Sequence, residues 1–127
     1  MVETKIALAL RSMECVAAKD LDGVMAFFTE DAVFFDPHYP KSRMQGHVEI
    51  ADGIRWGFNG LKKLGFDVIE TYESADGKSV VVSVRTAHVL PNGKPLNFFN
   101  CFFSSLKVNL SSRCRLMCSM SRMAWWE

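Results

Sequence analysis

The chain has 127 residues, of which 49% are hydrophobic, a size and composition that suit one globular domain with a buried core. Its 15 basic and 14 acidic residues give a net charge of +1, so no global charge attracts nucleic acid or an anionic membrane. The charge is nevertheless uneven, because residues 104–127 hold four basic residues against one acidic residue.

The N-terminal segment MVETKIALALRSMEC carries charges around a very short apolar run. This run is too broken for a signal sequence and too short for a membrane span, so we expect an intracellular, cytoplasmic protein. The four cysteines are Cys15, Cys101, Cys114 and Cys118, and their spacings match no common zinc pattern. Without a secretory signal, free thiols are favoured over disulfides or a metal site.

Apolar residues at helical spacing predict a first helix over residues 4–18. Asp20 fits the N-cap of a short second helix over residues 21–28. Residues 29–31 are then predicted to turn the chain, and residues 32–35 to form a short apolar strand. This strand delivers a carboxylate, that of Asp36, at its end.

Two prolines restrict the backbone that follows this strand. Pro37 disfavours helical geometry at Asp36, and Pro40 keeps the next residues extended, which predicts a stiff, exposed loop. Asp36 is therefore either a carboxylate that turns the chain or a group at the mouth of a catalytic site. His38 and Tyr39 in the same loop either are solvated or bind and gate a ligand.

Gly46 opens a predicted third helix, with apolar residues at helical spacing over residues 48–61. Gly53, Gly57 and Gly60 fall near one face of it, and each costs about 1 kcal/mol relative to alanine. We therefore expect this face to pack closely onto a sheet, the alternative being a helix that ends early.

From Phe66 onward the apolar period changes to two, which predicts strands over residues 66–73, 79–90 and 96–103. The sequences ADG and PNG between these strands are strong hairpin signals. Helices followed by an antiparallel meander predict an α+β domain. In the last strand Asn100 shares a face with aromatic residues, and burying its amide unpaired would cost about 1–3 kcal/mol. Asn100 therefore requires a protein partner, a water or a ligand.

Several apolar and histidine side chains are candidates for the wall of a pocket. Trp56, Phe98 and Phe102 suit a small hydrophobic or polycyclic ligand, the alternative for each being core packing. His88 is either a structural histidine or a ligand contact. The histidines lie far apart in the sequence and no carboxylate has ligand spacing, so we expect no metal.

Residues 104–127 show neither strand alternation nor a helical stripe. Suppose that the reading frame is moved, so that each new codon takes the third base of one residue's codon and the first two bases of the next. The genetic code then forces Val from residues 117–118. At the end of the chain it forces Gly, then an apolar residue (Val, Leu or Met), then Val and Gly. The same shift allows Glu-Phe-Glu-Gly-Glu over residues 104–109, an ordinary strand and turn. We hypothesise a frameshifted or mis-spliced last strand, the alternative being a genuine but unusual terminus.

The order of these elements, with EDAVFFDP at residues 30–37, resembles the nuclear transport factor 2-like superfamily. More narrowly, it resembles the SnoaL-like polyketide cyclase and ketosteroid isomerase branch. The resemblance covers residues 4–103 and implies a cone-shaped, bent antiparallel sheet wrapped on three N-terminal helices, with an aberrant C-terminal strand. It divides the chain into a SnoaL-like domain, residues 1–103, and an atypical tail, residues 104–127.

The resemblance also implies roles for individual residues. In ketosteroid isomerases the Asp of the Asp-Pro step is the general base, which corresponds to Asp36. The tyrosine that donates to the oxyanion falls on Ser12 by ungapped counting, and the second donor, a protonated Asp, falls on Asn100. An amide donates without any pKa adjustment, whereas Ser12 cannot replace the phenol, and this difference argues against steroid isomerisation itself.

The resemblance therefore implies a small apolar ligand in a cone-shaped cavity and an isomerase, cyclase or dehydratase with an Asp base and no cofactor. Family members commonly pair through the outer sheet face, so an intact sheet implies a homodimer. The alternatives are a non-catalytic ligand-binding or dimerisation domain of the same fold, and a non-functional product of a shifted reading frame.

Overall fold

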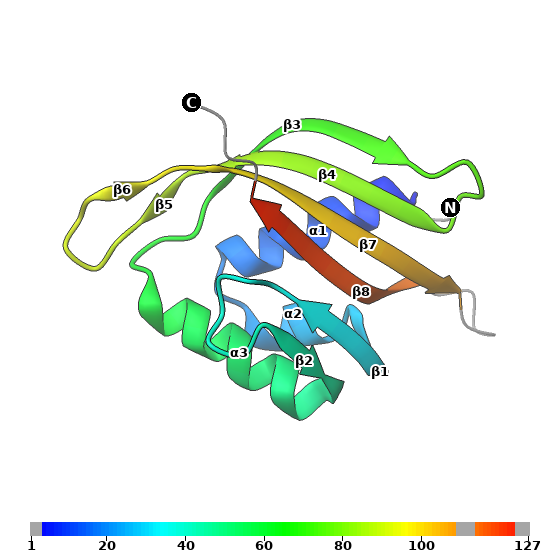
Figure 1. The fold of residues 1–127 in the computed structure, drawn as a ribbon, viewed down its shortest axis with the longest axis horizontal. Helices are drawn as coiled ribbons and strands as arrows, with labels where there is room; N and C mark the ends of the chain where they lie inside the picture. Colours follow the sequence, from blue (N-terminus) through cyan, green and yellow to red (C-terminus); the bar gives the residue numbers. More distant parts are fainter. Residues whose placement is uncertain (1–3, 109–113, 124–127) are drawn as a thin grey trace.

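The computed structural model describes the backbone of residues 4–108 and 114–123, and the side chains of residues 4–105. Figure 1 shows a long curved sheet that arches over the first helix, with the other two helices below it. In chain order the elements are α1 (Lys5–Ala17), α2 (Leu21–Met25), β1 (Phe28–Phe35), β2 (Arg43–Gln45), α3 (Gly46–Gly60), β3 (Phe66–Glu73), β4 (Ser79–Thr86), β5 (His88–Val89), β6 (Pro95–Leu96), β7 (Phe99–Val108) and β8 (Cys114–Met123). The predicted α+β class is confirmed.

The main sheet has the strand order β2-β1-β8-β7-β4-β3, and β5 pairs with β6 in a separate hairpin. Neighbouring described strands are antiparallel except β1 and β8, which run parallel. The hairpin projects beyond the main sheet at one end (Figure 1). Because β8 lies between β1 and β7, the last strand joins the two halves of the sheet.

Both N-terminal helices begin where the sequence predicts. The Thr4 side chain accepts a hydrogen bond from the Ala7 N–H at the start of α1, and the Asp20 side chain accepts one from the Gly23 N–H at the start of α2. The end predicted for the second helix is wrong, because α2 stops at Met25 and Phe28 already belongs to β1. The predicted turn over residues 29–31 is also wrong, because these residues lie within β1.

The reason for this difference lies in how β1 pairs. The backbone of Phe28 lies opposite Leu116 of β8, and the register of the two strands shifts before Val33. The polar residues 29–31 within this irregular stretch are partly or fully exposed, while Phe28 stays buried. The break in apolar alternation therefore marks an irregularity in strand pairing here and not a turn.

The third helix begins at Gly46 as predicted, with a positive φ of 82° that favours glycine. Gly53 packs against Met44 of β2, a strand that the sequence analysis did not predict. A Cβ at Gly57 would lie 2.9 Å from the Tyr39 ring, so this close approach is to a loop side chain and not to the sheet. A Cβ at Gly60 would meet nothing within 4 Å, so the expected packing does not extend to that position.

The later strands follow the predicted meander with one interruption. The strand predicted over residues 79–90 divides into β4 and β5, and the strand predicted to start at residue 96 divides into β6 and β7. The cause is Thr86, whose hydroxyl accepts from the Phe98 N–H at 2.9 Å and donates to the Leu96 carbonyl at 3.1 Å. Thr86 is 1% exposed, so these bonds replace a regular strand ladder inside the protein.

The tail contains a strand where the sequence pattern predicts none. The backbone of β8 pairs with β7 from Val108 back to Asn100 and with β1 on its other side. A strand held on both edges gains backbone hydrogen bonds whatever its side chains, so the absence of alternation does not prevent pairing. The hypothesis of a shifted reading frame concerns how this strand was encoded and stays a prediction.

Buried apolar side chains form two clusters. The first joins α2, β1, β2 and α3 and includes Phe28, Ile54 and Phe58. The second joins α1 to β4 through Leu8, Ala9 and the valines of β4. Neither cluster fills the space beneath the bend of the sheet, and the candidate site lies there.

Candidate functional site

A cavity of about 390 Å³ lies between the two core clusters. Its walls come from α1, α2, β1, the loop after β1, α3, β3, β4, the hairpin and β7. The volume falls within the range of small-molecule pockets, and its lining is mostly apolar and aromatic. All eight residues singled out from the sequence line it, namely Asp36, His38, Tyr39, Trp56, His88, Phe98, Asn100 and Phe102.

Asp36 lies directly after β1 and is 7% exposed, whereas Pro37, Pro40 and Lys41 of the loop that follows it are exposed. Its backbone N–H donates to the Ser42 carbonyl at 2.8 Å, which fixes the start of the loop. Its carboxylate atom Oδ1 accepts from the His38 backbone N–H at 2.9 Å and contacts the His38 ring at Nδ1 at 2.7 Å. Asp36 therefore both turns the chain and holds a titratable side chain in the cavity wall.

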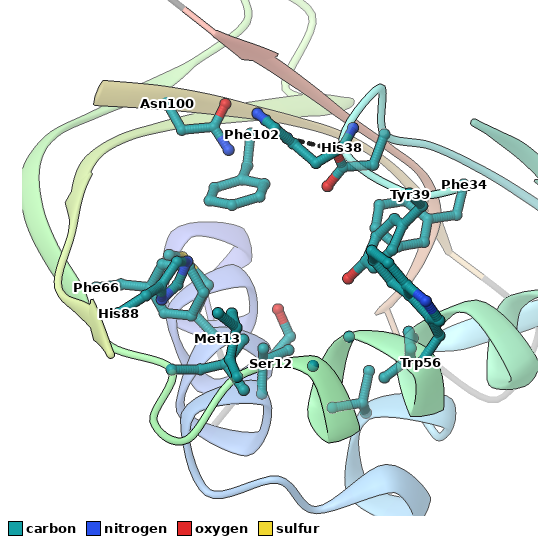
Figure 2. Close-up of a pocket in the computed structure, with 18 of the residues that line it drawn as sticks. Ser12, Met13, Phe34, His38, Tyr39, Trp56, Phe66, His88, Asn100 and Phe102 are labelled. Carbon is teal, nitrogen blue, oxygen red and sulfur yellow. Dashed lines mark hydrogen bonds and ion pairs between the residues drawn. The ribbon is translucent and has the colours of Figure 1, made fainter. Parts of the chain in front are cut away.

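The contact with Asp36 defines the tautomer of His38. A carboxylate oxygen accepts hydrogen bonds, so Nδ1 of His38 carries the donated proton. The other ring nitrogen, Nε2, is buried and has no partner among the described residues. Figure 2 shows the His38 ring extending from the loop toward Asn100 across one end of the cavity. In the neutral ring, Nε2 is thus an acceptor without a donor.

Asn100 lies on β7 and is 3% exposed. Its carbonyl atom Oδ1 is buried and, within the described part of the chain, finds no hydrogen-bond donor. The expected need for a partner is therefore not met by protein atoms at this oxygen. Two buried polar atoms, one on His38 and one on Asn100, are thus left for a ligand or water to satisfy.

His88 combines a structural bond with a place in the wall. Its Nδ1 accepts from the Gly65 N–H at 3.1 Å, so the proton of the neutral ring lies on Nε2. Burial, and secondarily the nearby His38, lowers the pKa of His88 below its ordinary value. The Phe98 ring lies between the two histidines, with centroids 5.1 Å from His38 and 5.9 Å from His88.

Tyr39 and Trp56 form the opposite wall (Figure 2). The two rings meet edge to face with centroids 5.6 Å apart, and Tyr39 makes a similar contact with Phe34. Burial, with a further contribution from the charge of Asp36, raises the pKa of Tyr39. Tyr39 is therefore a neutral phenol within the wall and not a fully solvated loop residue, and Trp56 is half-exposed at the rim.

Several lining residues were not singled out from the sequence as site residues. Phe66 meets the rings of His88 and Phe102 edge to face, at centroid distances of 5.2 and 5.7 Å. Ser12 also lines the cavity, but its hydroxyl donates to the Ala9 carbonyl at 2.6 Å. The apolar period of the sequence indicates that such residues face inward. It does not indicate whether they line a cavity or fill a core, because that depends on the curvature of the sheet.

The described residues contain no group of three or more histidine, cysteine or acidic side chains that could hold a metal ion. Cys15 and Cys101 are free thiols, whereas the side chains of Cys114 and Cys118 lie outside those described. None of the helices in the described part of the chain is long and apolar enough to cross a membrane.

Residues 9–107 match the family model for the SnoaL-like domain. The chain is also similar in structure to a nuclear transport factor 2-like protein of unknown function from Burkholderia pseudomallei, with 19% identity, a TM-score of 0.78, and coverage of 94% of this chain and 89% of that one. No curated protein is similar enough in sequence to count as a match.

Two further solved structures share the fold. A protein from Catenulispora acidiphila with a ketosteroid isomerase-like fold, in complex with trimethylamine, is 10% identical, with a TM-score of 0.75 and coverage of 94% of this chain and 86% of that one. A candidate SnoaL-like polyketide cyclase from Shewanella putrefaciens is 21% identical, with a TM-score of 0.71 and coverage of 93% and 78% respectively. At these identities the likeness establishes the fold alone.

The lowered pKa of His88 makes stability depend on pH. Below the ordinary histidine value of about 6.5, the unfolded chain binds a proton at His88 that the folded chain does not bind, so stability falls as the pH falls. The loss from one such group is at most about 1.4 kcal/mol per pH unit. We expect His88→Asn, which keeps an acceptor for Gly65, to lose less stability than the wild type between about pH 7.5 and 5.5 in urea unfolding. Equal losses would contradict this assignment.

Proposed function

Because the chain belongs to the SnoaL-like domain family, we propose that it catalyses acid/base proton transfer on a small apolar molecule, as an isomerase, cyclase or dehydratase. One observation carries the proposal. The buried Asp36 carboxylate and the half-buried His38 ring form a pair at one end of an apolar cavity, near an amide whose carbonyl oxygen has no partner among the described residues. A titratable pair in a concave apolar site is a typical acid/base arrangement.

The walls favour a planar ring as the ligand. Phe98 and His38 lie at a tilt of 33°, and Phe66, Tyr39 and Trp56 present further ring faces and edges to neighbouring aromatic groups. A bicyclic or larger ketone would place its apolar body among these rings and its oxygen near Asn100. The amide then donates to the oxygen as negative charge develops on it.

The chemistry follows from this placement. The Asp36–His38 pair removes a proton from the carbon next to the carbonyl, and the electrons of the broken C–H bond form a C=C bond while the carbonyl electron pair moves to oxygen. The same pair returns the proton at another carbon, which isomerises the substrate. In a cyclase the enolate carbon instead attacks a second carbonyl carbon of the same molecule, the electron pair of that C=O bond moves to its oxygen, and the pair gives its proton to the alkoxide that forms. The likeness to a candidate polyketide cyclase and to a ketosteroid isomerase-like protein supports this class of reaction.

The test is deuterium exchange at the carbon next to the carbonyl of 2-tetralone, an apolar bicyclic ketone, followed by NMR in D₂O. We expect the protein to accelerate exchange over buffer. Asp36→Asn should lower the rate by about 100-fold or more, because it disrupts the acid/base pair. Asn100→Leu should lower it by about 100-fold, because the donor to the developing oxyanion is lost.

Asp52→Asn is the matched control for the charge change. Asp52 is exposed on α3 and pairs with Arg55, so its substitution should leave exchange unchanged. If tetralone binds but its deuterium exchange is not accelerated, this result would contradict catalysis and favour a non-catalytic ligand-binding domain of the same fold.

We also propose that residues 104–127 are a shifted-frame replacement of the normal last strand, following a SnoaL-like domain over residues 1–103. The family match ends at residue 107, near the start of this tail, and β8 occupies a central place in the sheet. If the residues of this central strand come from a shifted frame, they would lower the stability of the sheet on both sides of β8. This chain would then be a non-functional product.

The proposal about the tail predicts that a chain carrying the shifted-frame ending melts cooperatively and at a higher temperature than the present chain. Calorimetry of the two chains side by side measures this difference. Equal melting, or an intact frame when the transcript is sequenced across codons 102–105, would contradict the proposal. The exchange experiment is run on both chains.

The homodimer stays a prediction. Its support is a row of side chains on the outer sheet face, where Tyr72 of β3 lies opposite Val81 of β4 and Val81 lies opposite Phe103 of β7. Tyr72 is 52% exposed and Phe103 is 42% exposed. An apolar row that crosses three strands suits a flat contact with a second copy.

A further inference from the structure

We infer that Nε2 of His38 is the atom that takes and returns the proton, and that Asp36 is a positioning residue that acts through His38. This inference rests on the proposed function and makes it specific. The sequence directs attention to Asp36, because a strand ends at that carboxylate. The hydrogen bonds of Asp36 indicate that it positions His38 and is not itself the base.

The hydrogen bonds of Asp36 point to this division of roles. Its Oδ1 accepts two hydrogen bonds from His38, one from the backbone at 2.9 Å and one from Nδ1 at 2.7 Å. A carboxylate that fixes the tautomer of an imidazole and stabilises its protonated form makes the opposite ring nitrogen a base. The Asp36 atom that contacts His38 is therefore already occupied in the free protein.

The free nitrogen of His38 is where a base would be needed. Nε2 is buried, lacks a partner among the described residues and extends toward Asn100 (Figure 2). The histidine on the hairpin differs, because the Gly65 N–H occupies its Nδ1 and burial lowers its pKa. His88 is thus a neutral N–H donor, and the proton acceptor at this end of the cavity is His38.

Asn100 and His38 also limit the substrate. The amide N–H of Asn100 would donate to the oxygen of a cyclic ketone, whereas its partnerless Oδ1 accepts from a donor such as the hydroxyl of the enol. With that oxygen at Asn100, the adjacent carbon faces His38. The substrate class is a planar cyclic ketone with an acidic C–H beside its carbonyl, or the corresponding phenol-like enol.

The proton transfer leaves charges that the site accommodates. Nε2 takes the proton, the C–H electron pair forms the C=C bond, and the carbonyl electron pair becomes the enolate oxygen held by Asn100. The resulting imidazolium faces the Asp36 carboxylate, the neutral phenol of Tyr39 and the neutral ring of His88. From β7 it faces the uncharged Asn100, so the one described negative charge in contact with it is that of Asp36.

The test is the rate of tetralone exchange in variants of the pair, after subtraction of the buffer rate. His38→Gln should lower the rate by about 100-fold or more, because the proton acceptor is lost. Added imidazole should restore exchange to His38→Ala and not to Asp36→Asn.

The outcomes separate the two proposals. Activity that is retained in His38→Gln and lost in Asp36→Asn would overturn this inference and make the carboxylate the base. No acceleration by the wild type would overturn the proposed function and the inference together. Rescue by imidazole also distinguishes a proton acceptor from a residue needed for folding alone.

Discussion

The hydrogen bond of 2.7 Å between Asp36 and the His38 ring is the contact on which the site depends. It exists because β1 ends in a buried carboxylate and because two residues later the chain presents a histidine to the same oxygen. Pro37 between them restricts the backbone, and the Ser42 carbonyl holds the other side of the loop. Each of these conditions belongs to a stretch of seven residues, so a local segment builds a reactive pair.

The cavity itself is a property of the whole fold. The Thr86 hydroxyl bonds to Leu96 and Phe98 where the regular ladder after β4 is interrupted, and the cavity lies between the two apolar clusters. The aromatic wall opposite depends on Gly57, because a side chain there would displace the Tyr39 ring. The cavity of about 390 Å³ therefore depends on residues from most elements of the fold, with Gly57 of α3 among those that line it.

The sequence predicts the parts of this structure that depend on local chemistry. The helix starts at Thr4 and Asp20, and the turns at Gly77 and Gly93 where φ is positive, follow from residues that act within a few positions. The end of α2 and the polar residues inside β1 were mispredicted, because pairing with β8 decides them and that partner lies far along the chain. The His38 contact was missed because its loop was expected to face solvent.

The ¹⁵N chemical shifts of the His38 ring, measured by NMR on labelled protein near neutral to mildly alkaline pH, test the central claim most directly. They report which ring nitrogen carries the proton, without any assumption about the substrate. The account predicts a protonated Nδ1 that donates to Asp36 and a bare Nε2 that faces the cavity. A neutral ring with its proton on Nε2 would contradict the account, because the remaining lone pair would lie on Nδ1, which contacts Asp36 and not the cavity.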